Sequence, residues 1–169
     1  MKPKSVSRWY LLSSLFLSVA ALATPSPAPA KDPPSDLCSL LPPDQLRKVL
    51  GQGYGAPEKS VAPPPYAANP PGTQCVYSAE KGPGPKVIFI VYVDPSVSVA
   101  KETFNKLSMF YSPSTPAAGI GDSAYVDRRH AIHILAGKVR YFIDISIDNF
   151  TPEKDKQLKD LAGSVAGQL

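Results

Sequence analysis

The sequence predicts an α+β domain in which a roughly five-stranded, mainly antiparallel sheet is covered by two to three amphipathic helices. Apolar residues recur at helical spacing in three segments, and alternating apolar runs occur in the second half of the chain. The links between the predicted strands are short, which favours an antiparallel or mixed sheet. We expect a single domain over residues 37–169, joined by one disulfide.

The first 36 residues predict an exported protein. Three basic residues precede a mostly apolar run over residues 10–22, and Ala21 and Ala23 supply small residues at positions −3 and −1 of a cleavage site. This pattern is typical of a signal peptide over residues 1–23, with cleavage after Ala30 as the alternative. The apolar run is too short for a membrane anchor, which needs about 20 residues. A Pro-rich, disordered leader is expected over residues 24–36 and a secreted or periplasmic location for the mature protein.

The first half of the domain predicts a helix, two strands and a second helix. Asp36 or Ser35 caps a short turn, and a helix begins near Pro43 and stops at Gly51. Strands are expected over residues 73–79 and 86–94, the second of them central because it is apolar on both faces. An amphipathic helix is expected over residues 96–111.

The Pro-rich stretch 56–72 is incompatible with a helix or a central strand. We interpret it as a long loop, and long loops without regular structure are often functional. It is therefore a candidate binding surface.

The stretch 116–125 contains a Gly-x-Gly-Asp pattern, which we interpret as a chain reversal. Gly119 and Gly121 permit a positive φ, and Asp122 is expected to bond the local backbone. A strand follows near residues 123–127, with Ala124 and Val126 turned inward.

Two alternating runs flank Gly137-Lys138, which predicts a two-residue hairpin turn. This register gives one apolar face, with three opposing pairs: Ala136 and Val139, Ile134 and Tyr141, Ile132 and Ile143. Ile145 and Ile147 extend that face. A last helix starts with Thr151 as N-cap and Pro152 at its first position.

The other face of the hairpin carries the best polar constellation. In the predicted register His133 opposes Phe142, with Arg140 and Asp144 as its diagonal neighbours. These three polar side chains would bind an anion or act as an acid/base pair. The alternative is an ordinary solvated sheet face, which antiparallel sheets commonly have. Tyr54 and Tyr66 are further binding candidates because tyrosine in a Gly/Pro-rich loop offers a flat apolar body and a polar tip.

No catalytic residue, metal site or cofactor is predicted. The two histidines, His130 and His133, lie three apart on one predicted strand and so point to opposite faces. Motifs for a serine nucleophile, a zinc site or a phosphate loop are missing from the sequence. Removal of residues 1–23 takes three of the 18 basic residues, leaving 15 against 14 acidic residues and a net charge of +1. Such a chain has no footprint for nucleic acid.

Two cysteines, Cys38 and Cys75, are expected to pair in an exported protein. Free thiols or a metal site are the alternatives, but a zinc site needs three or four ligands at short spacings.

The order of short motifs resembles a family of uncharacterised bacterial envelope domains. The motifs are Asp36-Leu37-Cys38, Leu50-Gly51, Cys75-Val76-Tyr77, Phe104 in the middle helix and residues 119–124. Members are mostly secreted or lipid-anchored, common in actinobacteria, and similar to PsbP-like lipoproteins and to extracellular sensor domains of some kinases. The resemblance covers most of residues 35–169. It implies an antiparallel sheet covered by helices, a Cys38–Cys75 bridge and no established enzyme activity, although this chain lacks the cysteine of a lipid-attachment motif.

These observations predict an exported, monomeric, non-enzymatic domain that binds a small ligand, an envelope glycan or a partner protein. One alternative is a hydrolase or other acid/base enzyme that uses His133 and Asp144. Another is a structural or inhibitor-like interaction protein, which would expose an apolar patch rather than a pocket.

Overall fold

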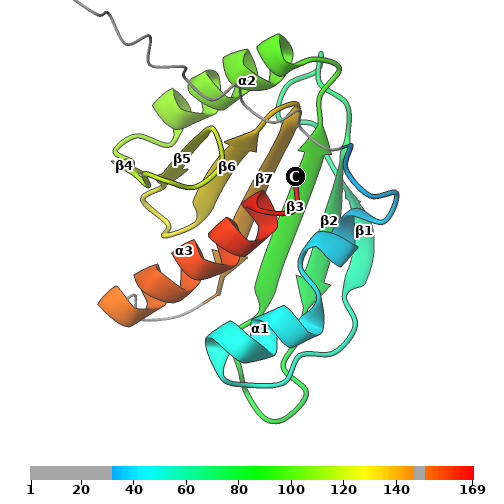
Figure 1. The fold of residues 1–169 in the computed structure, drawn as a ribbon, viewed down its shortest axis with the longest axis vertical. Helices are drawn as coiled ribbons and strands as arrows, with labels where there is room; N and C mark the ends of the chain where they lie inside the picture. The colour runs from blue at the N-terminus through cyan, green and yellow to red at the C-terminus, as the bar shows by residue number, and fades with distance from the viewer. Residues whose placement is uncertain (1–31, 147–150) are drawn as a thin grey trace, which may run out of the picture.

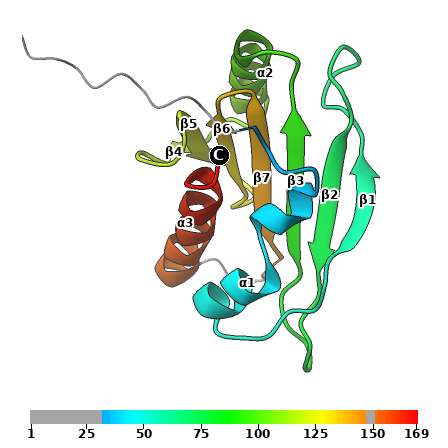
Figure 2. The same ribbon diagram turned by 45° about the vertical axis from the view of Figure 1, so that its right-hand side comes forward.

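Seven antiparallel strands form one sheet in the computed structural model, which describes residues 32–146 and 151–169. Figure 2 shows the strands side by side, and their order across the sheet is β1–β2–β3–β7–β6–β5–β4. Their bounds are β1 Glu58–Ala62, β2 Gly72–Tyr77, β3 Val87–Val93, β4 Thr115–Pro116, β5 Ser123–Val126, β6 Ile132–Ala136 and β7 Val139–Ile145. The α+β class is confirmed.

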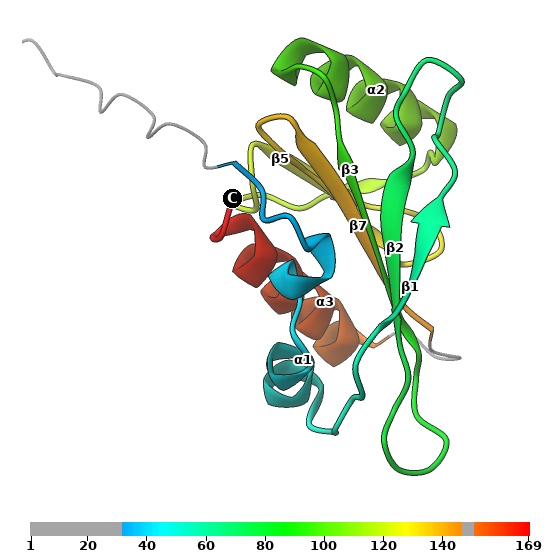
Figure 3. The same cartoon turned by 90° about the vertical axis from the view of Figure 1, so that its right-hand side faces the viewer.

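Helices cover both faces of the sheet (Figures 1 and 3). The short 3-10 helix η1 (Leu37–Leu40), α1 (Pro43–Leu50) and α3 (Pro152–Ala166) lie on one side, and α2 (Val97–Phe110) lies on the other. We call these the inner face and the outer face of the sheet. Most of the hydrophobic core lies between the inner face and α3, whereas α2 packs on Tyr125 and Leu135 of the outer face.

The expected number of strands was wrong, because β1 and β4 were not predicted. Both lie at the edges of the sheet. β1 lies within the Pro-rich stretch 56–72, between Pro57 and Pro63, and β4 itself contains Pro116. Edge strands tolerate proline because one side of the strand has no partner to receive an N–H. The exclusion of a central strand was therefore correct, but the Pro-rich stretch is not wholly loop.

The register of the β6–β7 hairpin is confirmed. Ala136 pairs with Val139, Ile134 with Tyr141 and Ile132 with Ile143, and Gly137 adopts φ 57° in the turn. Because side chains alternate along a strand, this register places one set of residues in the core and the other on the outer face. Ile147, expected to extend the apolar face, lies outside the described residues.

The chain reversal at residues 116–125 forms as expected in its backbone but not in its side-chain bond. Gly119 and Gly121 have φ of 80° and 58°, and a Cβ at Gly121 would lie 2.5 Å from the carbonyl oxygen of Leu135. Asp122 does not bond the local backbone: its Oδ2 accepts from the N–H of Gly137, 15 residues away, at 2.7 Å. The tight turn brings Asp122 beside the β6–β7 turn, and this long-range partner replaces a local one.

His130 does not lie on a strand with His133. β6 begins only at Ile132. His130 lies in a turn with φ 64°, and its N–H donates to the carbonyl oxygen of Asp127 at 2.9 Å. The side chain of Asp127 accepts from the N–H groups of Arg129 and Ala131, which fixes this turn, so the strand begins only after it.

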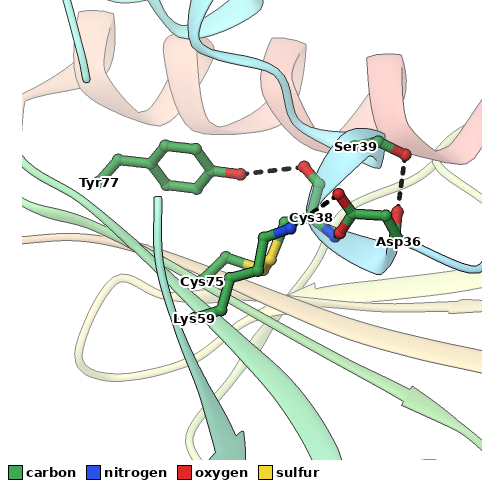
Figure 4. Close-up of polar contacts among 6 residues, drawn as sticks. All are labelled: Asp36, Cys38, Ser39, Lys59, Cys75 and Tyr77. Atoms are coloured by element: carbon green, nitrogen blue, oxygen red, sulfur yellow. Dashed lines mark hydrogen bonds and ion pairs between the residues drawn. A yellow bond between two sulfur atoms is a disulfide. The ribbon is translucent and has the colours of Figure 1, made fainter. Parts of the chain in front are cut away.

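The disulfide between Cys38 and Cys75 joins η1 to β2, with a Cα–Cα distance of 5.8 Å (Figure 4). The Tyr77 hydroxyl donates to the carbonyl oxygen of Cys38 at 3.1 Å. The Asp36 side chain accepts from the N–H of Cys38 at 3.1 Å and from Lys59 Nζ at 2.8 Å. These contacts hold the beginning of the domain on the β1–β2 side of the sheet.

None of the helices within the described residues has the length and hydropathy that crossing a bilayer requires. The predicted signal peptide, residues 1–23, lies outside the described residues, and so does the leader as far as residue 31.

Replacing Cys38 and Cys75 by alanine together should lower the free energy of unfolding by about 4 kcal/mol, because the bond closes a long loop of the unfolded chain. Urea denaturation of the variant and of the oxidised wild type measures the difference. Reduction of the wild type serves as the control and should give a similar loss. A loss below about 1 kcal/mol in both would contradict a stabilising role.

Candidate ligand-binding cavity

A cavity of about 170 Å³ lies between α2 and the outer face of the sheet. Residues with aromatic or imidazole rings make up much of its lining, among them Tyr92 of β3, Phe104 of α2, Tyr111 just beyond α2, His133 of β6 and Phe142 of β7. The remaining lining residues are Pro65, Ile90, Leu107, Ile134, Arg140 and Tyr141. The cavity therefore combines an apolar wall with groups able to form hydrogen bonds, among them the side chains of Arg140 and His133.

The position of α2 creates this cavity. Ser96 caps the helix by accepting from the N–H of Val99 at 3.3 Å. Ala100 and Phe104 are buried against Tyr125 and Leu135, whereas Leu107 is only half-buried. The helix therefore packs closely on the sheet at Ala100 and Phe104 and less closely at Leu107, which lines the cavity.

A buried ion pair forms one wall of the cavity. Arg140 donates from Nε to Asp94 Oδ2 and from Nη2 to Asp94 Oδ1, the latter at 3.1 Å. Both side chains are almost completely buried. The guanidinium also lies over the ring of Tyr92, 4.9 Å from its centroid. Bidentate geometry of this kind fixes the orientation of the guanidinium plane.

Asn69 links this ion pair to the Pro-rich loop and to α2. Its Nδ2 lies 3.3 Å from Asp94 Oδ1 and 3.1 Å from Thr103 Oγ1, and all three residues are buried. Pro65, four residues earlier in the same loop, lines the cavity. The loop expected as a binding surface thus contributes to the cavity through its C-terminal half.

His133 is paired with Asp127, which follows β5. His133 Nε2 lies 3.0 Å from Asp127 Oδ2, and both side chains are buried. Burial raises the pKa of Asp127, but the hydrogen bond from His133 and those from the N–H groups of Ala131 and Arg129 outweigh it, so that the pKa lies below its usual value. Asp127 is therefore a carboxylate, and Nε2 of His133 carries the hydrogen that it accepts.

The ring of His133 is held among aromatic neighbours. Tyr125 stacks on it with centroids 4.7 Å apart and planes 12° apart, and Tyr111 and Phe142 lie at 5.0 and 5.1 Å. These contacts, together with Asp127, leave the imidazole a single orientation. Its Nδ1 makes no hydrogen bond within the described residues.

The structure brings two of the five predicted binding residues together. His133 and Arg140 both line the cavity, whereas Asp144 lies on the same sheet face but outside it. Burial, and secondly the charge of Asp127, raise the pKa of Asp144. The carboxylate that pairs with His133 is Asp127, so the expected pairing with Asp144 is not seen.

The two loop tyrosines do not line the cavity. Tyr54 is only 1% exposed; it belongs to the core, where its hydroxyl accepts from Gln52 Nε2 at 2.6 Å and its backbone bridges to Ala79. A glycine-rich sequence suggested an open loop, but the bridge draws Tyr54 inward. Tyr66 is 39% exposed in the Pro-rich loop.

Sequence patterns did not identify three polar residues of this region, Asp94, Asp127 and Asn69. Each lies just after a strand or in a loop, where a single polar residue is usually a turn former. The only sequence signal was a pair of isolated carboxylates directly following apolar strands. Among the described residues, no group of three or more His, Cys, Asp or Glu side chains is placed to hold a metal ion.

No family model, curated protein or solved structure matches this chain. The resemblance to bacterial envelope domains therefore stays a prediction.

Asp127→Asn should lower the free energy of unfolding near pH 7 by about 1.5–3 kcal/mol, because an amide cannot replace all the hydrogen bonds of the buried carboxylate. Asp144→Asn should raise it, because burial disfavours the charge there. The pKa of Asp127 lies below 3.8, so the destabilisation by Asp127→Asn should fade as pH falls below 3.8. The pKa of Asp144 lies above 3.8, so the stabilisation by Asp144→Asn should already be lost at that pH. Thermal unfolding as a function of pH checks both signs; two effects of the same sign would contradict the assignment.

Tyr125→Phe should stabilise the protein by about 1 kcal/mol, because the buried Tyr125 hydroxyl has no hydrogen-bond partner among the described residues. Tyr141→Phe is the matched control: the Tyr141 hydroxyl donates to the carbonyl oxygen of Ala162 at 2.8 Å, so its loss should destabilise by about 1 kcal/mol. Urea denaturation measures both, and destabilisation by Tyr125→Phe would show that its hydroxyl has a partner.

Proposed function

We propose that this protein is an exported, non-catalytic domain of the cell envelope that binds a small, mainly apolar ligand in the cavity beneath α2. The observation that carries the proposal is a ring-lined cavity in which Arg140 is balanced by Asp94, and His133 is hydrogen-bonded by Asp127. Small-molecule sites are typically apolar concavities with a few oriented polar groups. The signal-peptide pattern and the disulfide support export, because disulfides persist in oxidising compartments.

The size of the cavity favours a small molecule over a glycan chain. An apolar cavity of about 150 Å³ holds one benzene molecule, and this one has about 170 Å³. It therefore accommodates one ring with a small substituent. A glycan chain would need a longer groove with more polar groups than Arg140 and His133 supply.

The alternative of an acid/base enzyme would now rest on His133 and Asp127. This buried pair resembles the base and orienting group of many hydrolases. The lining residues include no serine, threonine, cysteine or lysine, so no such nucleophile lies beside the imidazole in the cavity. Binding without turnover is thus the function that the geometry supports best.

The interaction-protein alternative is favoured by one observation outside the cavity. Met109 and Phe110, at the end of α2, are 75% and 72% exposed. A partner that used this pair would leave the cavity free, so its binding would be independent of substitutions inside the cavity.

Ile90→Trp should abolish binding of small aromatic probes such as benzyl alcohol, because the larger side chain fills the cavity. Ile88→Trp is the matched control, since Ile88 is also half-buried on the outer face of β3 but does not line the cavity. Amide chemical-shift titration of the protein, expressed from the full chain, measures the dissociation constant. We expect Ile90→Trp to weaken the affinity at least tenfold, which corresponds to about 1.4 kcal/mol of binding free energy. Ile88→Trp should change the affinity less than threefold.

Equal losses in both variants would place the ligand elsewhere on the outer face. Failure of every aromatic probe to shift resonances of residues around the cavity would overturn the proposed function.

A further inference from the structure

The Nη1 atom of Arg140 is an available hydrogen-bond donor. Arg140 uses Nε and Nη2 to bind Asp94, and Nη1 makes no hydrogen bond within the described residues. The residue lines the cavity, and its guanidinium is fixed by Asp94 on one side and by the ring of Tyr92 on the other. The N–H groups of Nη1 are therefore held ready for an acceptor on a ligand.

A second polar atom is an acceptor. The carboxylate of Asp127 accepts from Nε2 of His133, so Nδ1 carries a lone pair whenever the imidazole is neutral. His133 also lines the cavity, and the stacked ring of Tyr125 prevents it from turning. Arg140 and His133 are diagonal neighbours on β7 and β6, so their side chains approach the same volume from adjacent strands.

The charges around the cavity disfavour an ionic ligand. The charge of Arg140 is already balanced by Asp94, and Asp127 adds a carboxylate behind His133. An anionic ligand would bring a buried charge with no unpaired counter-charge to meet it. A cationic ligand is disfavoured because its charge would lie beside the positively charged guanidinium of Arg140.

We infer that the ligand is a neutral, single-ring aromatic compound whose substituent both accepts and donates a hydrogen bond, as a primary aromatic amide does. The substituent accepts from Nη1 of Arg140 and donates to Nδ1 of His133, while the ring packs among Tyr92, Tyr111 and Phe142. Aromatic rings pack well edge-to-face or offset against such neighbours. This inference rests on the proposed function, because it specifies the ligand of the same cavity.

Four probes of nearly equal shape separate the possibilities: benzamide, acetophenone, toluene and benzoate. Benzamide offers a donor and an acceptor, acetophenone offers an acceptor only, toluene offers neither group, and benzoate carries a negative charge. Dissociation constants are measured by amide chemical-shift titration of the protein, expressed from the full chain, at about pH 8, where histidine is ordinarily neutral. We expect benzamide to bind most tightly, with a loss of roughly threefold or more for each hydrogen bond removed and the weakest binding for benzoate.

His133→Phe tests the acceptor directly. Phenylalanine keeps a ring that can stack on Tyr125 but has no nitrogen to accept a hydrogen bond, so the preference for benzamide over acetophenone should disappear. Retention of that preference in a folded variant would overturn the role of His133, and the four probes on the wild type decide the inference if the variant does not fold.

The outcomes separate this inference from the proposed function. Equal affinity for toluene and benzamide would overturn the inference and leave the apolar cavity as the site. Tightest binding by benzoate would show an anion site and overturn it as well. If none of the four probes binds, both fall together.

Discussion

The buried ion pair between Arg140 and Asp94 is the interaction on which the outer face depends. Two charges removed from water are stable only when their geometry is good and their remaining groups are bonded. Here the bidentate contact, the Tyr92 ring and Asn69 meet that requirement. Because Asn69 also contacts Thr103, the same pair connects β7 and β3 to the Pro-rich loop and to α2. The carboxylate of Asp94 thus joins Arg140 on the sheet to Asn69 of the Pro-rich loop.

This arrangement separates the two faces of the sheet by physical character. The inner face is closed by α1 and α3 over a continuous apolar core, with polar groups such as the Tyr141 hydroxyl bonded to a helix carbonyl. The outer face is closed only partly, by α2 and the Pro-rich loop. Its buried polar side chains other than the Tyr125 hydroxyl belong to two networks, one centred on Asp94 and one on Asp127. Most of the apolar core therefore lies on one face, and the other face keeps a cavity beneath α2.

Local patterns were sufficient to predict much of the fold. Side-chain alternation and the Gly137-Lys138 turn determine the hairpin register, so the common face of His133, Arg140 and Asp144 followed from the sequence. Helix boundaries followed from caps such as Thr151 and from Gly51. The edge strands could not be predicted, because β1 and β4 form only through pairing with a neighbour, and their prolines hide the pattern. The disulfide followed from composition, whereas the inward position of Tyr54 depends on a bridge to Ala79.

The polar groups of the cavity mark the limit of such prediction. The carboxylate that meets Arg140 is 46 residues away in sequence, and the amide that supports it is 25 residues from that carboxylate. Alternation along β6 and β7 selects the face on which His133 and Arg140 lie, but a strand pattern holds no information about which distant carboxylate reaches that face. Asp94 and Asp127 do so because β3 and β5 flank the hairpin in the sheet order. Each of these strands is followed by an aspartate directed to the outer face, where one balances the guanidinium and the other orients the imidazole. The site is therefore a consequence of topology: a hairpin inserted between two strands receives its partners from both sides.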